Sequence, residues 1–173
     1  ILNNNCINLI NIKYNPKKAF ENISNKSNSY IKKSFDKALK IIKLDLSNKL
    51  INGPISKKNF LNKKYLGITE YLAKKTNSKK IAMLIYNKKL SVCPITTHIK
   101  INNISKNLSM KKIYEKIITV NKFYLKKFRF KPKICVLGLN PHNYELLNDS
   151  EEKRIILPAL KKLKKNGINV KGP

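Results

Sequence analysis

Segments with the apolar spacing of α-helices alternate along this chain with short apolar runs typical of strands, and this alternation constrains the fold most. Apolar side chains recur at steps of three and four in residues 28–44 and 109–128, which predicts two amphipathic helices. Strand-like runs occupy residues 6–12, 49–52, 81–86, 90–95, 133–137 and 168–170. Helices between strands predict a layered α/β/α domain with a mostly parallel sheet.

The sheet is predicted to be mixed, because two of its strands are joined by a short turn. Residues 81–86 and 90–95 are separated only by Asn87, Lys88 and Lys89. A turn of this length favours an antiparallel hairpin. The fold class predicted from the sequence is therefore α/β with a mixed, mostly parallel sheet.

Residues that favour helix ends refine these boundaries. Ser109 is a good N-cap for the helix after it, and the Thr69 hydroxyl can cap a short helix of its own. Ser150 precedes two glutamates, and carboxylates interact favourably with the positive end of the helix dipole, so a helix is expected to begin there. Pro158 is expected to kink that helix or to begin a second one, and Gly167 to end it.

The net charge of +29 makes a nucleic-acid-binding module one alternative function. Only Arg129 and Arg154 among the 38 basic residues are arginines, whereas proteins that read nucleic acid rely on arginine for bidentate and stacked contacts. The lysines are spread along the whole chain together with frequent Asn and Ile, a mixture typical of an AT-rich coding sequence. We therefore expect no specific nucleic-acid partner, only attraction to polyanions at low salt.

Length, hydropathy and cysteine use point to a protein with a real core in a reducing compartment. The 173 residues are 42% hydrophobic, yet no run approaches the roughly 20 apolar residues of a membrane span, so no membrane partner is expected. The start lacks the basic and apolar regions of a signal peptide. Cys6, Cys93 and Cys135 have neither metal-ligand nor redox spacing, which suggests a reducing compartment. Because Ile1 is not a methionine and Pro173 follows a glycine in a turn-like segment, we expect a fragment cut at both ends.

The only two histidines each follow a strand-like run. His142 ends the sequence Gly-Leu-Asn-Pro-His after residues 133–137, and His98 ends Thr-Thr-His after residues 90–95. Ligands of open α/β sheets bind beyond the carboxyl ends of strands, and imidazole is the commonest metal ligand. Each histidine alone fits a structural or surface role better. Together they predict a shared metal site, which needs further ligands because three protein ligands plus water are usual.

Four segments, in order and at matching separations, resemble the 4-hydroxythreonine-4-phosphate dehydrogenase family of pyridoxal phosphate biosynthesis. They are Asn52–Lys57 (NGPISK), Gly67–Tyr71 (GITEY), Ala82–His98 (ending in TTH) and Gly138–His142 (GLNPH), and a fifth, Gly167–Pro173, matches a turn of the family. The resemblance covers the chain from about residue 25. It implies that residues 1–173 are the central portion of a two-domain α/β dehydrogenase, truncated at both ends.

The resemblance also implies a reaction and a set of site residues. His98 and His142 match the family's ligands for a divalent metal (Zn, Mg or Co), whose third ligand is a histidine beyond residue 173. Thr69 matches a substrate-contacting threonine that suits a phosphate, although an ordinary N-cap role explains it equally well. The family oxidises 4-phosphooxy-threonine, a small phosphorylated hydroxy-amino acid, with NAD or NADP and with decarboxylation. A cytoplasmic homodimer with a shared active site is implied, whereas no residue is assigned to the nicotinamide cofactor or to a catalytic role.

Two departures from the family keep a catalytically decayed paralogue open as an alternative. Ile68 stands where the family has a histidine beside the substrate, and Ile cannot form a hydrogen bond through its side chain. After His142 the family has a glycine-rich run with a glutamate; Glu145 remains, but Tyr144, Leu146 and Leu147 stand where glycines are expected. Glycine permits a positive φ and close backbone approach, which bulky residues mostly forbid.

Overall fold

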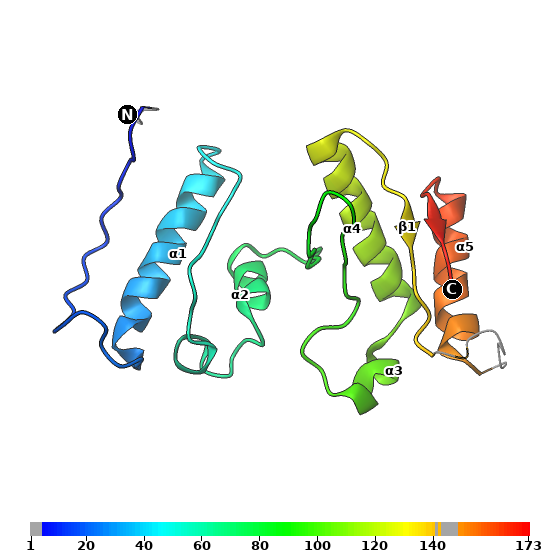
Figure 1. Cartoon of the computed structure of the whole chain (residues 1–173), viewed down its shortest axis with the longest axis horizontal. Helices are drawn as coiled ribbons and strands as arrows, with labels where there is room; N and C mark the ends of the chain where they lie inside the picture. Colours follow the sequence, from blue (N-terminus) through cyan, green and yellow to red (C-terminus); the bar gives the residue numbers. More distant parts are fainter. Residues whose placement is uncertain (1–4, 141, 143–148) are drawn as a thin grey trace. The chain divides into compact units, whose positions relative to one another are not determined.

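A computed structural model of the chain describes residues 5–140, 142 and 149–173 and divides the chain into two compact units, Ile1–Asn77 and Ser78–Pro173 (Figure 1). The first unit contains η1 (Asn25–Ser27), α1 (Asn28–Lys43), η2 (Lys57–Leu61) and α2 (Ile68–Lys75). The second contains η3 (Ile101–Asn103), α3 (Ile104–Asn107), α4 (Met110–Phe128), β1 (Ile134–Cys135), η5 (Glu152–Ile156), α5 (Leu157–Lys165) and β2 (Val170–Lys171). Among the described residues no helix is long and apolar enough to cross a membrane.

The first unit is built around an aromatic core between α1 and α2. Phe35 of α1 and Tyr71 of α2 are buried, with ring centroids 5.3 Å apart in an edge-on arrangement. Leu61 at the end of η2 completes the buried cluster. An ion pair of 2.7 Å between Lys75 and Asp36 joins the two helices at the surface. The helix predicted over residues 28–44 is thus confirmed within one residue, because its apolar spacing buries one face against this core.

Two predicted strands of the first unit do not form. Residues 6–12 and 49–52 have no strand structure, and Ile7 and Leu9 are 94% and 86% exposed. A strand is stabilised by the backbone hydrogen bonds of a neighbour, and within the described ranges neither segment has one. The prediction of strands here is wrong, because pairing depends on a partner that local sequence does not reveal.

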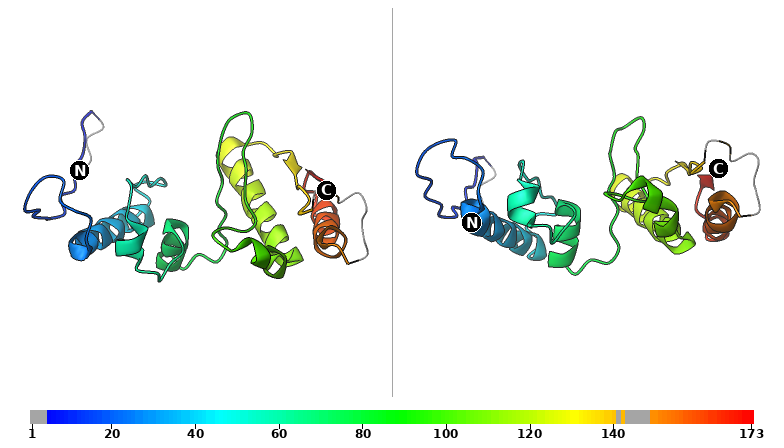
Figure 2. Two further views of the ribbon diagram at one scale, coloured as in Figure 1. Left: turned by 60° about the horizontal axis from the view of Figure 1, so that its bottom comes forward. Right: turned by 90° about the horizontal axis from the view of Figure 1, so that it is seen from below.

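In the second unit, α4 packs against α5 over a core that includes Ile113, Ile117, Leu160 and Leu163 (Figure 2). The Ser109 hydroxyl accepts a hydrogen bond of 3.3 Å from the Lys112 N–H, which confirms its predicted role as the N-cap of α4. These helices flank β1 and β2, which pair in parallel with Ile134 opposite Val170.

The predicted hairpin of the second unit is reduced to a single antiparallel bridge. Ile85 and Val92 exchange both backbone hydrogen bonds, at 2.8 and 3.0 Å, and the flanking residues form no further ladder. Ile85, Leu90 and Val92 are exposed, so little apolar burial supports a longer ladder. The structure is therefore rich in helix with a small parallel sheet, which is compatible with the predicted α/β class but forms much less sheet than predicted among the residues described.

The C-terminal segment follows the predicted helix signals closely. A helix begins after Ser150, whose hydroxyl accepts from the Lys153 N–H, and α5 begins anew with Pro158 in its first turn. Gly167 has a φ of 71° and donates to the Lys164 carbonyl, while Ile168 donates to the Leu163 carbonyl. This pair of hydrogen bonds is a Schellman motif, which ends α5 and directs the chain into β2.

Candidate functional site

The turn after β1 is held in place by the end of the sheet. The Val136 N–H donates to the Lys171 carbonyl at 2.9 Å, and among the described residues no backbone hydrogen bond joins β1 to β2 beyond this point. Gly172 has a φ of 111°, and a Cβ atom built on it would lie 2.0 Å from the Val136 carbonyl oxygen. Only glycine fits such a close backbone approach. The chain therefore leaves the sheet from a fixed point, two residues before Gly138.

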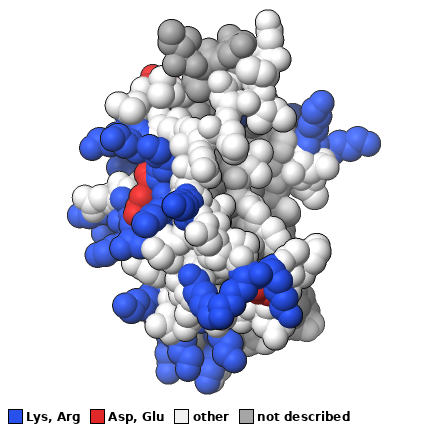
Figure 3. Space-filling model, turned by 90° about the vertical axis from the view of Figure 1, so that its left-hand side faces the viewer, with Lys and Arg blue, Asp and Glu red and all other residues white. Residues whose placement is uncertain are grey.

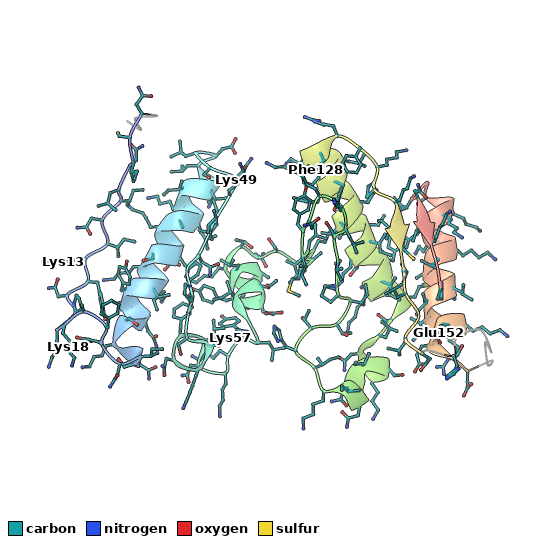
Figure 4. The ribbon with its side chains drawn as sticks, viewed as in Figure 1. Lys13, Lys18, Lys49, Lys57, Phe128 and Glu152 are labelled. Atoms are coloured by element: carbon teal, nitrogen blue, oxygen red, sulfur yellow. The ribbon has the colours of Figure 1, made fainter. Side chains whose placement is uncertain are left out.

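Beyond that point the turn is bound by a buried carboxylate. Glu152 has no exposed surface, and its Oε1 accepts hydrogen bonds from the backbone N–H groups of Leu139 and Asn140 at 2.7 and 2.9 Å. The Asn140 side-chain amide donates to Oε2 of the same carboxylate at 3.0 Å. Figure 4 labels Glu152 near the start of α5, beside the polypeptide that leaves β1. Both oxygens of Glu152 are thus engaged by the turn.

A second carboxylate lies beside the first and is more exposed. Glu151 accepts from the Asn140 side-chain amide at 3.3 Å and from the Ser105 hydroxyl of α3. The Ser105 hydrogen bond is the main cause that lowers the pKa of Glu151. Burial alone favours the neutral form of Glu152, but the hydrogen bonds from the backbone and side chain of Asn140 outweigh it and lower the pKa of Glu152 below its ordinary value. Both groups are therefore expected to be ionised at neutral pH.

The two predicted metal ligands both lie in the second unit and are both exposed. His142 lies in a turn just after the segment bound by Glu152, and His98 has a φ of 56° at the end of the Thr-Thr-His sequence. Imidazole is a suitable ligand for Zn or Co. Over the described ranges no three His, Cys, Asp or Glu side chains lie close enough to hold a metal. The residues thus fit a metal site in kind but supply only part of it, and the shared site at His98 and His142 stays a prediction.

Thr69 lies in the other unit and does not cap its helix. The N-cap of α2 is Gly67, with an extended backbone, and Thr69 is the second residue of the helix, so the predicted capping role is wrong by two positions. Glycine is an acceptable N-cap. With Gly67 in this position the helix begins at Ile68, whereas a cap at Thr69 would begin it at the next residue. The half-buried side chain of Thr69 therefore lies in the first turn, where backbone N–H groups are available to an anion.

Ile68 packs against the core of the first unit. It contacts the cluster of Phe35, Leu61 and Tyr71, so its side chain has an apolar packing role at the position where the family resemblance predicts a histidine. The other departure, residues 144–147 after His142, lies outside the described residues. Lysine side chains are spread over the face shown in Figure 3 and are interrupted by uncharged residues, which agrees with a solvated basic surface.

Sequence reasoning missed the role of Glu152. The sequence Ser-Glu-Glu predicted only a helix start, and the Gly-Leu-Asn-Pro-His sequence directed attention to the histidine. The available signal was a pair of adjacent glutamates in a chain with only nine acidic residues, close to a turn rich in backbone donors. Nothing local indicated that one of them would be buried.

Comparison with known proteins gives a consistent result. The family model of the pyridoxal phosphate biosynthetic protein PdxA matches residues 2–173. The chain is 39% identical over 142 residues to a 4-hydroxythreonine-4-phosphate dehydrogenase of Sulfurihydrogenibium, covering 80% of this chain and 44% of the relative. It is 40% identical over 112 residues to a D-threonate 4-phosphate dehydrogenase of Pectobacterium atrosepticum, covering 63% and 34%.

Solved structures agree with the sequence relatives. The crystal structure of 4-hydroxythreonine-4-phosphate dehydrogenase from Klebsiella pneumoniae matches with a TM-score of 0.78 and 28% identity, covering 88% of this chain and 48% of that one. A putative enzyme of the same name from Salmonella typhimurium matches with a TM-score of 0.76 and 28% identity, covering 88% and 47%. The chain thus spans about half the length, or less, of the proteins it matches.

Proposed function

This chain belongs to the family of the pyridoxal phosphate biosynthetic protein PdxA, and we propose from that membership that its protein is an NAD-dependent dehydrogenase of 4-phosphooxy-threonine. The observation that carries the proposal lies in the sequence Gly-Leu-Asn-Pro-His, which matches the family and in which a buried glutamate binds Leu139 and Asn140. Some relatives are named for 4-hydroxythreonine 4-phosphate and others for D-threonate 4-phosphate. Both names describe a phosphorylated hydroxy acid. These names support the proposal that the substrate is a small phosphorylated hydroxy acid.

His98 and His142 are proposed to hold a divalent metal together with ligands outside the described residues. When bound, such a cation (Zn, Mg or Co) polarises an oxygen of the substrate as a Lewis acid. Each of the two imidazoles would bind the cation through a ring nitrogen. Both side chains are exposed, so metal and substrate can reach them.

Thr69 is proposed to contact the phosphate of the substrate. Its hydroxyl lies in the first turn of α2, where the N–H groups and the positive end of the helix dipole favour an anion. NAD or NADP is proposed as the hydride acceptor. No glycine-rich phosphate loop occurs among the described residues, so we assign no contact to the cofactor. A homodimer with a shared active site belongs to the same proposal and follows from family membership alone.

The test is a turnover assay on the full-length protein. The protein is stripped with a chelator and supplied with Co²⁺, Zn²⁺ or Mg²⁺, and formation of NADH or NADPH is followed with 4-phosphooxy-threonine and with D-threonate 4-phosphate. Metal-dependent turnover is expected with one of them, with a loss of at least about 100-fold in His142→Ala. The matched control is Lys161→Ala, an exposed residue of α5, which should turn over like wild type. Full turnover in His142→Ala would contradict the role of this histidine.

The second candidate function is a catalytically inactive member of the same family. The packing of Ile68 against the core of the first unit favours it, because that position has become part of an apolar cluster. In this case neither substrate would be turned over with any of the three metals, while the protein would still be folded. The nucleic-acid alternative requires tight binding at physiological salt, which a salt titration of DNA or RNA binding measures directly.

A further inference from the structure

The buried carboxylate of Glu152 controls the backbone just before His142. We propose that Glu152 is a positioning residue, which fixes the turn at Leu139 and Asn140 and thereby sets the position of the His142 imidazole for a divalent metal. This inference rests on the proposed function of His142 as a ligand. It adds to that function a residue ten positions further along the chain, in a different element of the second unit.

The hydrogen bonds explain why a carboxylate is needed. The N–H groups of Leu139 and Asn140 follow the point where β1 and β2 cease to pair, so the sheet no longer binds them. Glu152 Oε1 accepts both, at 2.7 and 2.9 Å. Hydrogen bonds to an ionised acceptor are shorter and about twice as strong as those between neutral groups. One carboxylate oxygen therefore fixes two successive peptide groups of the turn.

The Glu152 side chain is itself held in a fixed position. Glu152 is the first residue of η5, a single turn of π-helix, and it is fully buried. The same turn ends at Ile156, which belongs to the core between α4 and α5. A π-turn often marks a functional site because it reorients side chains within a helix. The position of the Glu152 carboxylate is thus set by the core, and the turn takes its position from the carboxylate.

A substitution at Asn140 distinguishes the effect of Glu152 on the geometry of the turn from the effect of its negative charge. Its side-chain amide donates to Glu152 Oε2 at 3.0 Å and to the neighbouring Glu151 at 3.3 Å. Glu152→Gln replaces one acceptor by a donor that faces this amide. The double variant Glu152→Gln with Asn140→Asp restores a complementary pair, because an aspartate accepts from the new glutamine amide. A role in geometry predicts that the double variant recovers part of the lost function.

The experiment measures Co²⁺ binding to the full-length protein by titration, with the visible absorption spectrum of bound Co²⁺ as a report on ligand geometry. Glu152→Gln is expected to weaken Co²⁺ binding by roughly 10- to 100-fold, the usual effect of removing a group that orients a metal ligand. Glu151→Gln removes the same charge one residue away but no backbone hydrogen bond to the turn, and is expected to weaken binding by less than about 3-fold. In Glu152→Gln the amide NMR signals of Leu139 and Asn140 should also shift.

The outcomes distinguish this inference from the proposed function. Wild-type Co²⁺ affinity in Glu152→Gln, together with loss of binding in His142→Ala, would overturn the positioning role and leave the function intact. Wild-type affinity in His142→Ala as well would overturn the proposed ligand itself. If Glu152→Gln does not fold, Glu152→Asp decides, because aspartate keeps the charge but is one methylene shorter, so its carboxylate is drawn back from the N–H groups of Leu139 and Asn140. Unchanged Co²⁺ binding in Glu152→Asp would contradict the inference.

Discussion

Replacing Gly172 by alanine is expected to destabilise the second unit strongly. The new Cβ would lie 2.0 Å from the Val136 carbonyl oxygen and 3.0 Å from its carbonyl carbon, both of which are backbone atoms. An ordinary C···O contact is about 3.3–3.6 Å, so the two strands must separate by roughly 1 Å or more. A side chain cannot rotate away to relieve this contact, because Cβ is fixed by the backbone.

The magnitude follows from three contributions. A non-glycine residue at a φ of 111° costs about 1–3 kcal/mol. Separation of the strands weakens the hydrogen bond of 2.9 Å from Val136 to Lys171, which contributes about 0.5–1.5 kcal/mol. Displacement of Val170, which is buried in the core, adds about 1 kcal/mol. The expected loss in the free energy of unfolding is therefore about 3–5 kcal/mol, a large part of the stability of a small domain.

Gly167→Ala is the matched control for this prediction. Gly167 has a φ of 71° in the Schellman motif of α5, but a Cβ atom there meets nothing within 4 Å. Only the conformational cost of about 1–2 kcal/mol applies. Urea unfolding followed by circular dichroism measures both variants in the full-length protein. Equal losses in the two variants would refute the reasoning, because the close approach to Val136 would then contribute nothing.

Three further predictions concern single side chains, each tested by urea unfolding. Because the folded-state pKa of Glu152 is lowered, its contribution to stability is present above its ordinary value of 4.5 and is lost as pH falls through the folded pKa; Glu152→Gln should flatten this acid-side dependence. Ser109→Ala should cost about 1 kcal/mol by removing the N-cap of α4, and an unchanged midpoint would contradict that role. Tyr71→Phe should leave the first unit equally stable or stabilise it by up to about 1 kcal/mol, since the buried hydroxyl has no hydrogen-bond partner among the described residues; a loss above about 1 kcal/mol would contradict this.

Local signals in the sequence were sufficient for the helices and their ends. The apolar spacing of residues 28–44 and 109–128, the N-cap Ser109 and the C-terminal Gly167 all act within a few residues of the structure they specify. The strands were harder, because pairing joins distant segments. Residues 6–12 have strand-like composition but no partner among the described residues, whereas within residues 133–137 Ile134 and Cys135 pair with β2 and form a short strand.

The position of His142 along the chain followed from the sequence, but the hydrogen bonds that hold the preceding turn did not, and the metal site itself stays a prediction. The position of His142 after a strand was correctly inferred from the apolar run that ends before Gly138. The hydrogen bonds between Glu152 and the turn join residues 12 and 13 positions apart, and they depend on burial that only the packed helices create. Thr69 was misplaced for a similar reason, because a glycine two residues earlier begins the helix.

Glu152 and Ile68 concern two different properties of the protein, metal binding and turnover. The active and the inactive member of the family differ in turnover and need not differ in metal binding. A buried carboxylate is a poor choice for stability alone, since well-packed apolar residues often stabilise a protein equally or better. Its hydrogen bonds to the turn are better explained if the geometry before His142 matters. Ile68 acts through apolar packing within the core of the first unit. Metal binding and turnover are thus expected to fail independently. If Co²⁺ binding is lost in His142→Ala but the wild-type protein turns over neither substrate, the chain has kept the metal site of its family and lost the chemistry. If both are present, Ile68 is a tolerated change of the substrate pocket.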